Sequence, residues 1–397
     1  MNSIATTNHS PAGLNPAALS PDLDDFKVLV EQSAAADDYP GCSAVDSNVV
    51  IYEADRLRSA IAASAEAAVE LRRELAVVLD QGPGIFVIKG AMPDADVDRA
   101  TVAFNAIISD EKAAGLGSGD HYAKPGANER VWNALEKLAL AAPDVFVDYY
   151  RNDMLALGAL AWLGPNYQFS SQVNVVNPGG EAQRPHRDYH IGFMTDAMAE
   201  QYPAHAHRLS PALTLQGAVA HCSMPTESGP TMYMPHSQKY GPGYLAWRRP
   251  EFIEYFAANR VQLPLDKGDL VYFNPALFHA AGSNVTTDVH RIANLVQISS
   301  AFGRTMETID TMRMTEAVYP ILLEHRSTGM PDTELDNVIA ACAEGYAFPT
   351  NLDRDPPLGG LTPASQQDLV RRSLEENQSL EQMMEALRSH QDRQRSA

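Results

Sequence analysis

Apolar and polar residues follow two different periods along this chain. Residues 53–79 repeat with a helical period, and Gly82-Pro83-Gly84 ends that pattern. An apolar run at 85–88 predicts a short buried strand, and helical patterns return at about 94–108 and 143–163. Between residues 167 and 300 the pattern becomes short β-type runs divided by turn residues, at 169–176, 212–220, 231–234, 270–273 and 292–299, with one helix at about 244–259.

This spacing predicts a mainly β protein with flanking α-helices. Its core is expected to be an antiparallel double-sheet barrel or sandwich of the jelly-roll class. Residues 1–45 are rich in Ala, Pro, Ser and Asp without periodicity, so we expect a flexible N-terminal arm there. Residues 46–330 would form the main domain and residues 331–397 a helical C-terminal extension. The extra helices either cover the mouth of the barrel or build a face for a homo-oligomer, and the sequence leaves both open.

Charge and cysteine content exclude several partners. The 397 residues include 30 Lys and Arg against 50 Asp and Glu, a net charge of −20, so nucleic acid and anionic membranes are not expected partners. Cys42, Cys222 and Cys342 lie far apart, which argues against a disulfide framework and a thiolate zinc site. Residues 1–21 lack the features of a secretory signal, and the apolar stretch 154–163 is too short to span a bilayer. We therefore expect a cytoplasmic protein.

Two histidines and one carboxylate are candidates for a metal site. His186 and Asp188 are two positions apart, so in an extended strand both side chains point to the same face. This pair alone is weak evidence, because such a short pattern often arises by chance. His279 ends a later β-type stretch, and Arg291 opens the strand that follows it.

Two histidines and a carboxylate form the facial triad that holds non-haem Fe(II) with open coordination positions. Nitrogen and oxygen donors without thiolate suit iron better than structural zinc. An arginine in the same pocket would pair with a carboxylate. His190, two residues beyond Asp188, is the rival ligand.

Residues 84–305 resemble the phytanoyl-CoA dioxygenase family of Fe(II)/2-oxoglutarate-dependent oxygenases. The resemblance is carried by the order and spacing of several segments, which are Gly84 to Gly90, Gln183-x-x-His186-x-Asp188, Glu227-Ser228-Gly229-Pro230-Thr231 with Pro235 and Ser237, and Gly268-Asp269 with His279, Asn284 and Arg291. It implies a double-stranded β-helix, a cupin-like jelly roll, as the core.

The resemblance also implies a role for each matching residue. His186, Asp188 and His279 would bind the iron, and Arg291 would bind the distal carboxylate of 2-oxoglutarate. Thr231 would share that carboxylate, and Gln183 would contact the cosubstrate or line its pocket. The chain departs from the family at Pro235-His236-Ser237-Gln238, where Pro-Gly-Ser-His is usual, and at His221-Cys222, which replaces a common acidic pair. Because of these departures, the substrate pocket is not inferred from the family.

The implied activity is oxidation of an unactivated C–H bond in a small molecule, with hydroxylation as the leading outcome. Fe(II), 2-oxoglutarate and O2 would be required, and succinate and CO2 released. The presence of Asp188 favours hydroxylation, desaturation or ring chemistry over halogenation. The main alternative is a catalytically silent barrel that binds metal and 2-oxoglutarate as a sensor or assembly partner. A cupin-like barrel that uses the metal without a cosubstrate is a weaker alternative, because it leaves Arg291 without a functional role.

Overall fold

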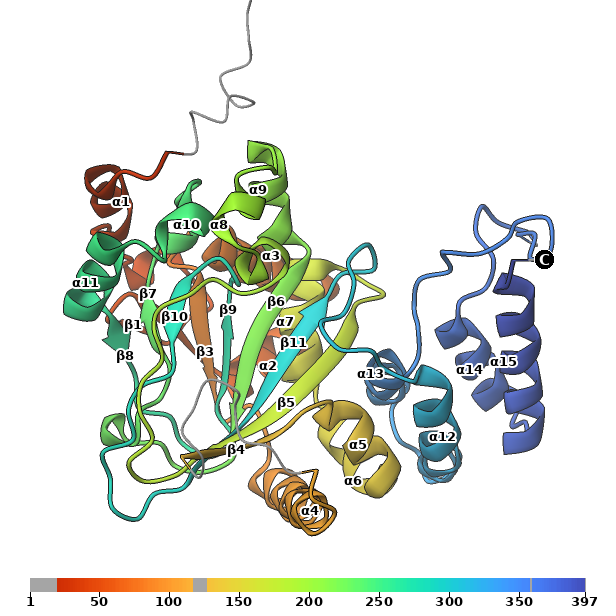
Figure 1. Ribbon diagram of the computed structural model, residues 1–397. Coiled ribbons are helices and arrows are strands. Elements are labelled where there is room, and N and C mark those ends of the chain that lie inside the picture. The colour runs from red at the N-terminus through yellow and green to blue at the C-terminus, as the bar shows by residue number, and fades with distance from the viewer. Residues whose placement is uncertain (1–19, 117–126, 358, 397) are drawn as a thin grey trace, which may run out of the picture.

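The computed structural model describes residues 20–116, 127–357 and 359–396. Its strands are β1 (Ala44–Asp46), β2 (Val49–Glu53), β3 (Ile85–Lys89), β4 (Asn128–Val131), β5 (Gln168–Val176), β6 (Thr214–Ala220), β7 (Met232–Met234), β8 (Val261–Gln262), β9 (Leu270–Phe273), β10 (Phe278–Ala280) and β11 (Arg291–Ser299). They form a large sheet, in the order β1-β2-β3-β9-β6-β11-β5-β4, and a small sheet, in the order β10-β7-β8 (Figure 1). All neighbouring strands are antiparallel except β2 and β3, which run parallel.

Helices surround these sheets on several sides. They are α1 (Leu23–Val30), α2 (Ala54–Ala63), α3 (Ala65–Asp80), α4 (Asp94–Ala113), α5 (Ala134–Ala141), α6 (Pro143–Tyr150), α7 (Asp153–Leu163), α8 (Asp196–Ala199), α9 (Ala204–Ala212), α10 (Gly243–Ala246), α11 (Pro250–Asn259), α12 (Thr311–Ser327), α13 (Asp332–Cys342), α14 (Gln366–Glu375) and α15 (Leu380–Gln394). Short 3-10 turns are η2 (Ala36–Asp38), η3 (His190–Phe193), η4 (Thr226–Ser228) and η5 (Ser237–Lys239).

The helices hold far more residues than the strands, so the predicted mainly β class is wrong. The architecture is a mixed eight-stranded sheet, a small three-stranded sheet and many helices. The β-type runs were found at nearly their observed positions, whereas the share of helix was underestimated. The flanking helices are as much a part of the fold as the sheets, because their apolar faces build the largest core cluster.

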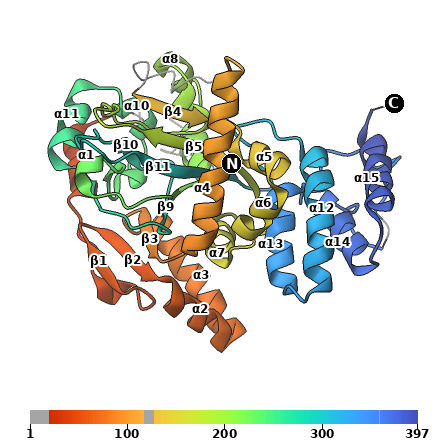
Figure 2. The same ribbon diagram turned by 90° about the horizontal axis from the view of Figure 1, so that it is seen from below.

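The inner strands of the large sheet are buried on both faces, and β9 shows how their residues divide between the two faces. Leu270 and Tyr272 belong to the large core between the sheet and the helices. Val271 and Phe273 point the opposite way and pack with residues of the small sheet, such as Tyr233. This alternation follows from the two-residue repeat of a strand. Figure 2 shows α2, α3 and α7 on one side of the sheet, with α8 and α10 on the other.

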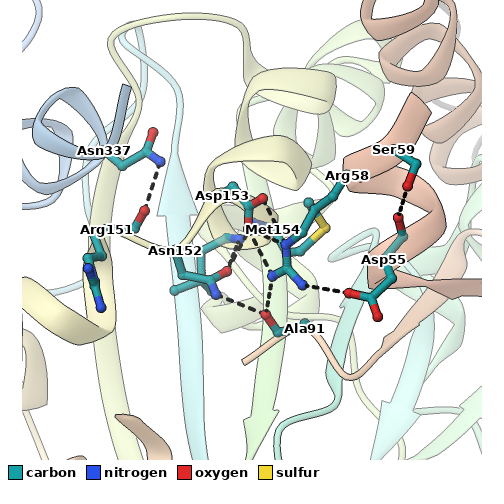
Figure 3. A network of polar contacts seen from close by, with 10 residues as sticks. Asp55, Arg58, Ser59, Ala91, Arg151, Asn152, Asp153, Met154 and Asn337 are labelled. Atoms are coloured by element: carbon teal, nitrogen blue, oxygen red, sulfur yellow. Dashed lines mark hydrogen bonds and ion pairs between the residues drawn. The ribbon is translucent and has the colours of Figure 1, made fainter. Parts of the chain in front are cut away.

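A polar network ties the helical layer to the large sheet (Figure 3). Asn152 caps α7, because its Oδ1 accepts hydrogen bonds from two backbone N–H groups in the first turn, at 2.9 and 3.1 Å. Its Nδ2 donates to the carbonyl of Ala91, which follows β3, at 2.9 Å. Arg58 of α2 donates to the same carbonyl and pairs with Asp153 through two nitrogens at 3.0 Å. Two helices are thereby fixed to the chain just beyond β3.

Helix α1 corrects the expectation of a flexible arm over residues 1–45. Residues 1–19 lie outside the described part of the chain, but α1 is a packed helix that Asp22 caps. Phe26 is completely buried, and its ring lies 5.1–5.2 Å from those of Tyr240, Phe252 and Phe278. The segment from α1 to β1 is therefore part of the folded body.

The C-terminal helices lie beyond one edge of the strand layers (Figure 1). Helix α12 packs on α5 and α6, α13 packs on β5 and α7, and α14 and α15 pack on α12 and on each other. Of the helices in the described ranges, none combines the length and the apolar character that crossing a membrane requires.

Candidate metal centre and cosubstrate pocket

A cavity of about 990 Å³ lies between the two sheets. Alternate residues of the large sheet form one wall, as in β11, where Arg291, Ala293, Leu295 and Gln297 line it. The six residues that the sequence singled out all line this one cavity, namely Gln183, His186, Asp188, Thr231, His279 and Arg291. Residues almost 110 positions apart in the chain are thus brought together.

Backbone pairing places the two histidines side by side. The N–H of His186 donates to the carbonyl of His279 at 2.9 Å, and the N–H of His279 donates back at 3.2 Å. Directly paired residues of neighbouring strands project to the same face, so the imidazole rings meet, with centroids 4.4 Å apart. Asp188 follows two residues after His186 and reaches the same face, as the spacing predicted.

Hydrogen bonds determine which ring nitrogen of each imidazole carries the hydrogen. The Nδ1 of His186 lies 2.9 Å from the carbonyl of Arg184, and the Nδ1 of His279 lies 2.9 Å from the carbonyl of Leu277. A carbonyl only accepts, so Nδ1 carries the hydrogen in both rings and, in the neutral form, Nε2 keeps its lone pair. The Nε2 atoms lie 3.6 Å and 3.4 Å from the carboxylate oxygens of Asp188.

The carboxylate of Asp188 is held in its charged form. Burial alone would raise its pKa, but the neighbouring His186, the bond with His279 and the amide of Gln216 outweigh burial and hold the pKa well below its usual range. One ligand atom from each of His186, Asp188 and His279 can be chosen so that all three lie within 4.8 Å of one another. Two imidazole nitrogens and one ionised carboxylate oxygen are the donor types that suit a divalent transition-metal ion.

Arg291 lies in the same cavity and is only 6% exposed. Its guanidinium donates to the carbonyl of Gly229, and burial lowers its pKa to about 10. No carboxylate of the described residues forms an ion pair with it. Gly229 has φ of +74°, and a Cβ there would lie 2.4 Å from the carbonyl oxygen of Ser283, so this turn requires glycine. A buried guanidinium that has no carboxylate partner among the described residues fits an anionic ligand.

Thr231 and Gln183 lie on the opposite wall. Thr231 immediately precedes β7, and its side chain is hydrogen-bonded to Tyr233, which lies across from His279 in the small sheet. Gln183 extends the pairing of this wall, because its backbone N–H donates to the carbonyl of Ala281 at 2.9 Å and its Oε1 accepts from the N–H of Ala281 at 3.4 Å.

Other histidines do not join this centre. The only cluster of metal-ligand type in the described ranges is the one formed by His186, Asp188 and His279. The rival ligand, His190, instead places Nδ1 3.1 Å from the hydroxyl of Ser210. His221 lies on the helical side of the sheet, between the hydroxyls of Thr101 and Tyr149 at 2.8 and 2.9 Å, and burial lowers its pKa to about 3.

Gln216 is a residue of this site that the sequence did not indicate. It lies in β6, lines the cavity and donates through Nε2 to Oδ2 of Asp188 at 2.5 Å. The only signal available was a polar residue within a mostly apolar run. That signal does not say which face of the strand Gln216 occupies or what it meets.

Two histidines and one carboxylate that could hold a non-haem metal ion, with a buried arginine in the same cavity, are the arrangement typical of one class of metal-dependent oxygenases. A family model described as phytanoyl-CoA dioxygenase (PhyH) matches residues 81–293, more than half of the chain. The chain therefore belongs to the phytanoyl-CoA dioxygenase family. It is an enzyme of the Fe(II)- and 2-oxoglutarate-dependent oxygenase class, which uses O2 as its second cosubstrate.

The solved structures that are similar to this chain include the following three. The non-haem α-ketoglutarate-dependent epimerase SnoN from nogalamycin biosynthesis is 19% identical, with 60% of this chain and 82% of that chain covered and a TM-score of 0.38. AviO1 from Streptomyces viridochromogenes Tue57 is 18% identical, with 58% and 96% covered and a TM-score of 0.43. The carbocyclase SnoK from nogalamycin biosynthesis is 18% identical, with 60% and 84% covered and a TM-score of 0.39. No curated protein matches this chain.

Proposed function

We propose that this protein oxidises an unactivated C–H bond of a small molecule, with hydroxylation as the main outcome and with release of succinate and CO2. The observation that carries the proposal is the convergence of His186, Asp188 and His279 in a cavity that also holds the buried Arg291. The three convergent side chains would hold Fe(II). Arg291 would bind the distal carboxylate of 2-oxoglutarate, assisted by Thr231, and Gln183 would line the cosubstrate pocket.

We further propose that the two sheets form a double-stranded β-helix. The order β9-β6-β11-β5 in the large sheet supports this, as does the small sheet, which the bridge between His186 and His279 extends beyond β10. In such a core the eight strands alternate between the sheets, so that the cavity lies between them. In this proposal residues 46–330 form the oxygenase domain, which α1 covers from outside, and residues 331–397 form its helical extension.

When bound, iron with 2-oxoglutarate and O2 supplies the oxidising power. The chain itself binds, orients and shields the reactants. The carbonyls of Arg184 and Leu277 hold the imidazoles with Nε2 toward the cavity, which keeps these nitrogens ready to bind a metal. Arg291 would meet an incoming carboxylate while itself buried, where a charge-assisted bond is strong. Asp188 occupies the position that halogenating relatives leave free, which favours hydroxylation, desaturation or ring chemistry.

The cavity wall also suggests the general character of the substrate. Its β3 and β9 side is apolar and includes Val87, Val271 and Phe273, whereas its β4 and β5 side carries Arg130, Gln172 and Asn174. A molecule with an apolar portion and a hydrogen-bonding portion matches such a wall. The volume of about 990 Å³ is large enough for a compact metabolite beside the cosubstrate.

The test is anaerobic loading with Fe(II) and 2-oxoglutarate, followed by exposure to air with a metabolite library and analysis by mass spectrometry. We expect succinate together with a product heavier by about 16 Da or lighter by about 2 Da. His186→Ala and Arg291→Ala are expected to abolish succinate formation, whereas His190→Ala, which changes the rival ligand, is expected to retain it. Binding of metal and 2-oxoglutarate without succinate from any library member would favour the silent sensor and reject the enzymatic proposal.

A further inference from the structure

Gln216 occupies a rigid position in the middle of the large sheet. Strand β6 lies between β11 and β9, and Gln216 is paired with Gln297 on one side and Phe273 on the other. Its side chain points into the gap between the sheets and is only 5% exposed. A buried carboxamide in a doubly paired strand has little freedom to move, so its hydrogen bond has a fixed direction.

This hydrogen bond divides the two oxygens of Asp188 between different partners. Oδ2 accepts from the Nε2 of Gln216 at 2.5 Å and lies 3.4 Å from the Nε2 of His279. Oδ1 lies 3.6 Å from the Nε2 of His186. A carboxylate only accepts hydrogen bonds, so the amide nitrogen of Gln216 must face it. Oδ2 is thus engaged by a neutral donor of the protein, whereas Oδ1 remains available.

We propose that Gln216 is a positioning residue that makes Asp188 bind the metal through one oxygen, Oδ1. The inference rests on the proposed function, because its consequence concerns the number of open coordination positions. Two imidazoles and one carboxylate oxygen leave three positions of an octahedral ion open. A carboxylate that bound through both oxygens would take a fourth position and compete with 2-oxoglutarate or O2. By engaging Oδ2, Gln216 prevents this while leaving the negative charge of Asp188 intact.

The experiment compares Gln216→Met and Gln216→Asn with Gln297→Met and Gln297→Asn. Methionine is close to glutamine in size but has no N–H, and asparagine keeps the carboxamide but is one methylene shorter. Gln297 provides a matched control, because it is the same residue type, directly opposite in the sheet and in the same cavity, without a bond to Asp188. Each purified full-length protein is titrated with Co(II) under nitrogen, and its visible absorption, which depends on coordination number, is recorded before and after addition of 2-oxoglutarate.

We expect both Gln216 variants to bind Co(II) about 10- to 100-fold more weakly than wild type, because the hydrogen bond that orients Asp188 is lost. We also expect an altered spectrum and a smaller response to 2-oxoglutarate, because Asp188 can then bind through both oxygens. Both Gln297 variants are expected to match wild type. Wild-type affinity and spectrum in the Gln216 variants would overturn the proposal, as would an equal loss in the Gln297 variants, which would indicate a general packing effect. Circular dichroism checks folding, and if Gln216→Met does not fold, Gln216→Asn decides.

The same titration separates this inference from the proposed function. If wild type binds Co(II) but 2-oxoglutarate changes neither the spectrum nor the products, the oxygenase proposal fails, while the comparison of variants still decides the role of Gln216. If wild type binds no metal, both proposals are rejected.

Discussion

The buried guanidinium of Arg291 gives the sharpest prediction. Burial lowers its pKa to about 10 from an ordinary value of 12.5, which corresponds to about 3 kcal/mol of unfavourable free energy in the charged form. A carboxylate at hydrogen-bonding distance would relieve much of this cost. Because 1.4 kcal/mol is a factor of ten in affinity, the contact between Arg291 and the distal carboxylate is expected to raise the affinity for 2-oxoglutarate about a hundredfold.

The perturbation is Arg291→Gln, and the assay compares two cosubstrates. In the anaerobic Fe(II) protein, wild type is expected to bind 2-oxoglutarate about a hundredfold more tightly than 2-oxobutyrate, which lacks the distal carboxylate. In Arg291→Gln this ratio is expected to fall close to one. Arg248→Gln is the matched control, since Arg248 also lines the cavity but already pairs with Asp196 at 2.8 Å. An unchanged ratio in Arg291→Gln would refute the assignment of Arg291 to the distal carboxylate.

Three further predictions concern stability in urea. Gly158→Ala is expected to destabilise by about 1–3 kcal/mol despite the better helix propensity of alanine, because its Cβ would lie 2.2 Å from the Tyr272 ring, whereas Gly241→Ala meets nothing within 4 Å and serves as control. Phe26→Ala is expected to cost about 3–5 kcal/mol, and Val28→Ala, at a position 71% exposed on the same helix, almost nothing. Between pH 6.5 and 3 the unfolded chain protonates His221 while the folded protein does not, so lowering the pH favours unfolding. As the pH is lowered, the free energy of unfolding of wild type is therefore expected to fall by about 1.4 kcal/mol per pH unit more than that of His221→Gln. Parallel plots of unfolding free energy against pH for the two proteins would contradict this.

The strands of the core could be predicted because each leaves a local signal. The run of β9 is apolar, those of β5, β6 and β11 mix apolar and polar residues, and turn residues such as Gly268 separate the runs. Helix boundaries were harder to predict where a polar cap interrupts a periodic pattern. Residues 53–79 read as one helix, yet Ser64 accepts from the N–H of Ala67 and starts α3 as a separate helix. Helix α12 leaves a weak signal because Pro320 lies within it.

The clustering of His186, Asp188 and His279 could be predicted in part, because one pair of these residues also leaves a local pattern. The two-residue spacing of His186 and Asp188 fixes a common face by strand geometry alone. Bringing His279 to them required the order and spacing of the family motifs, because backbone pairing between residues 93 positions apart leaves no local trace. The contact of Gln216 with Asp188 and the anchoring of Phe26 arise from the same kind of long-range packing, and neither was predicted.

The net charge of −20 is a property of the whole protein and does not describe the local charge of the cavity. Five arginines line the cavity, namely Arg130, Arg184, Arg187, Arg248 and Arg291, against the acidic Glu181 and Asp188. Beyond about 10 Å, salt at 0.1 M screens the acidic surface, so a bound anion responds mainly to these nearby charges. The overall charge therefore does not argue against an anionic cosubstrate. An acidic exterior and a basic interior together allow the cavity to take up a small dianion while the surface opposes extended polyanions.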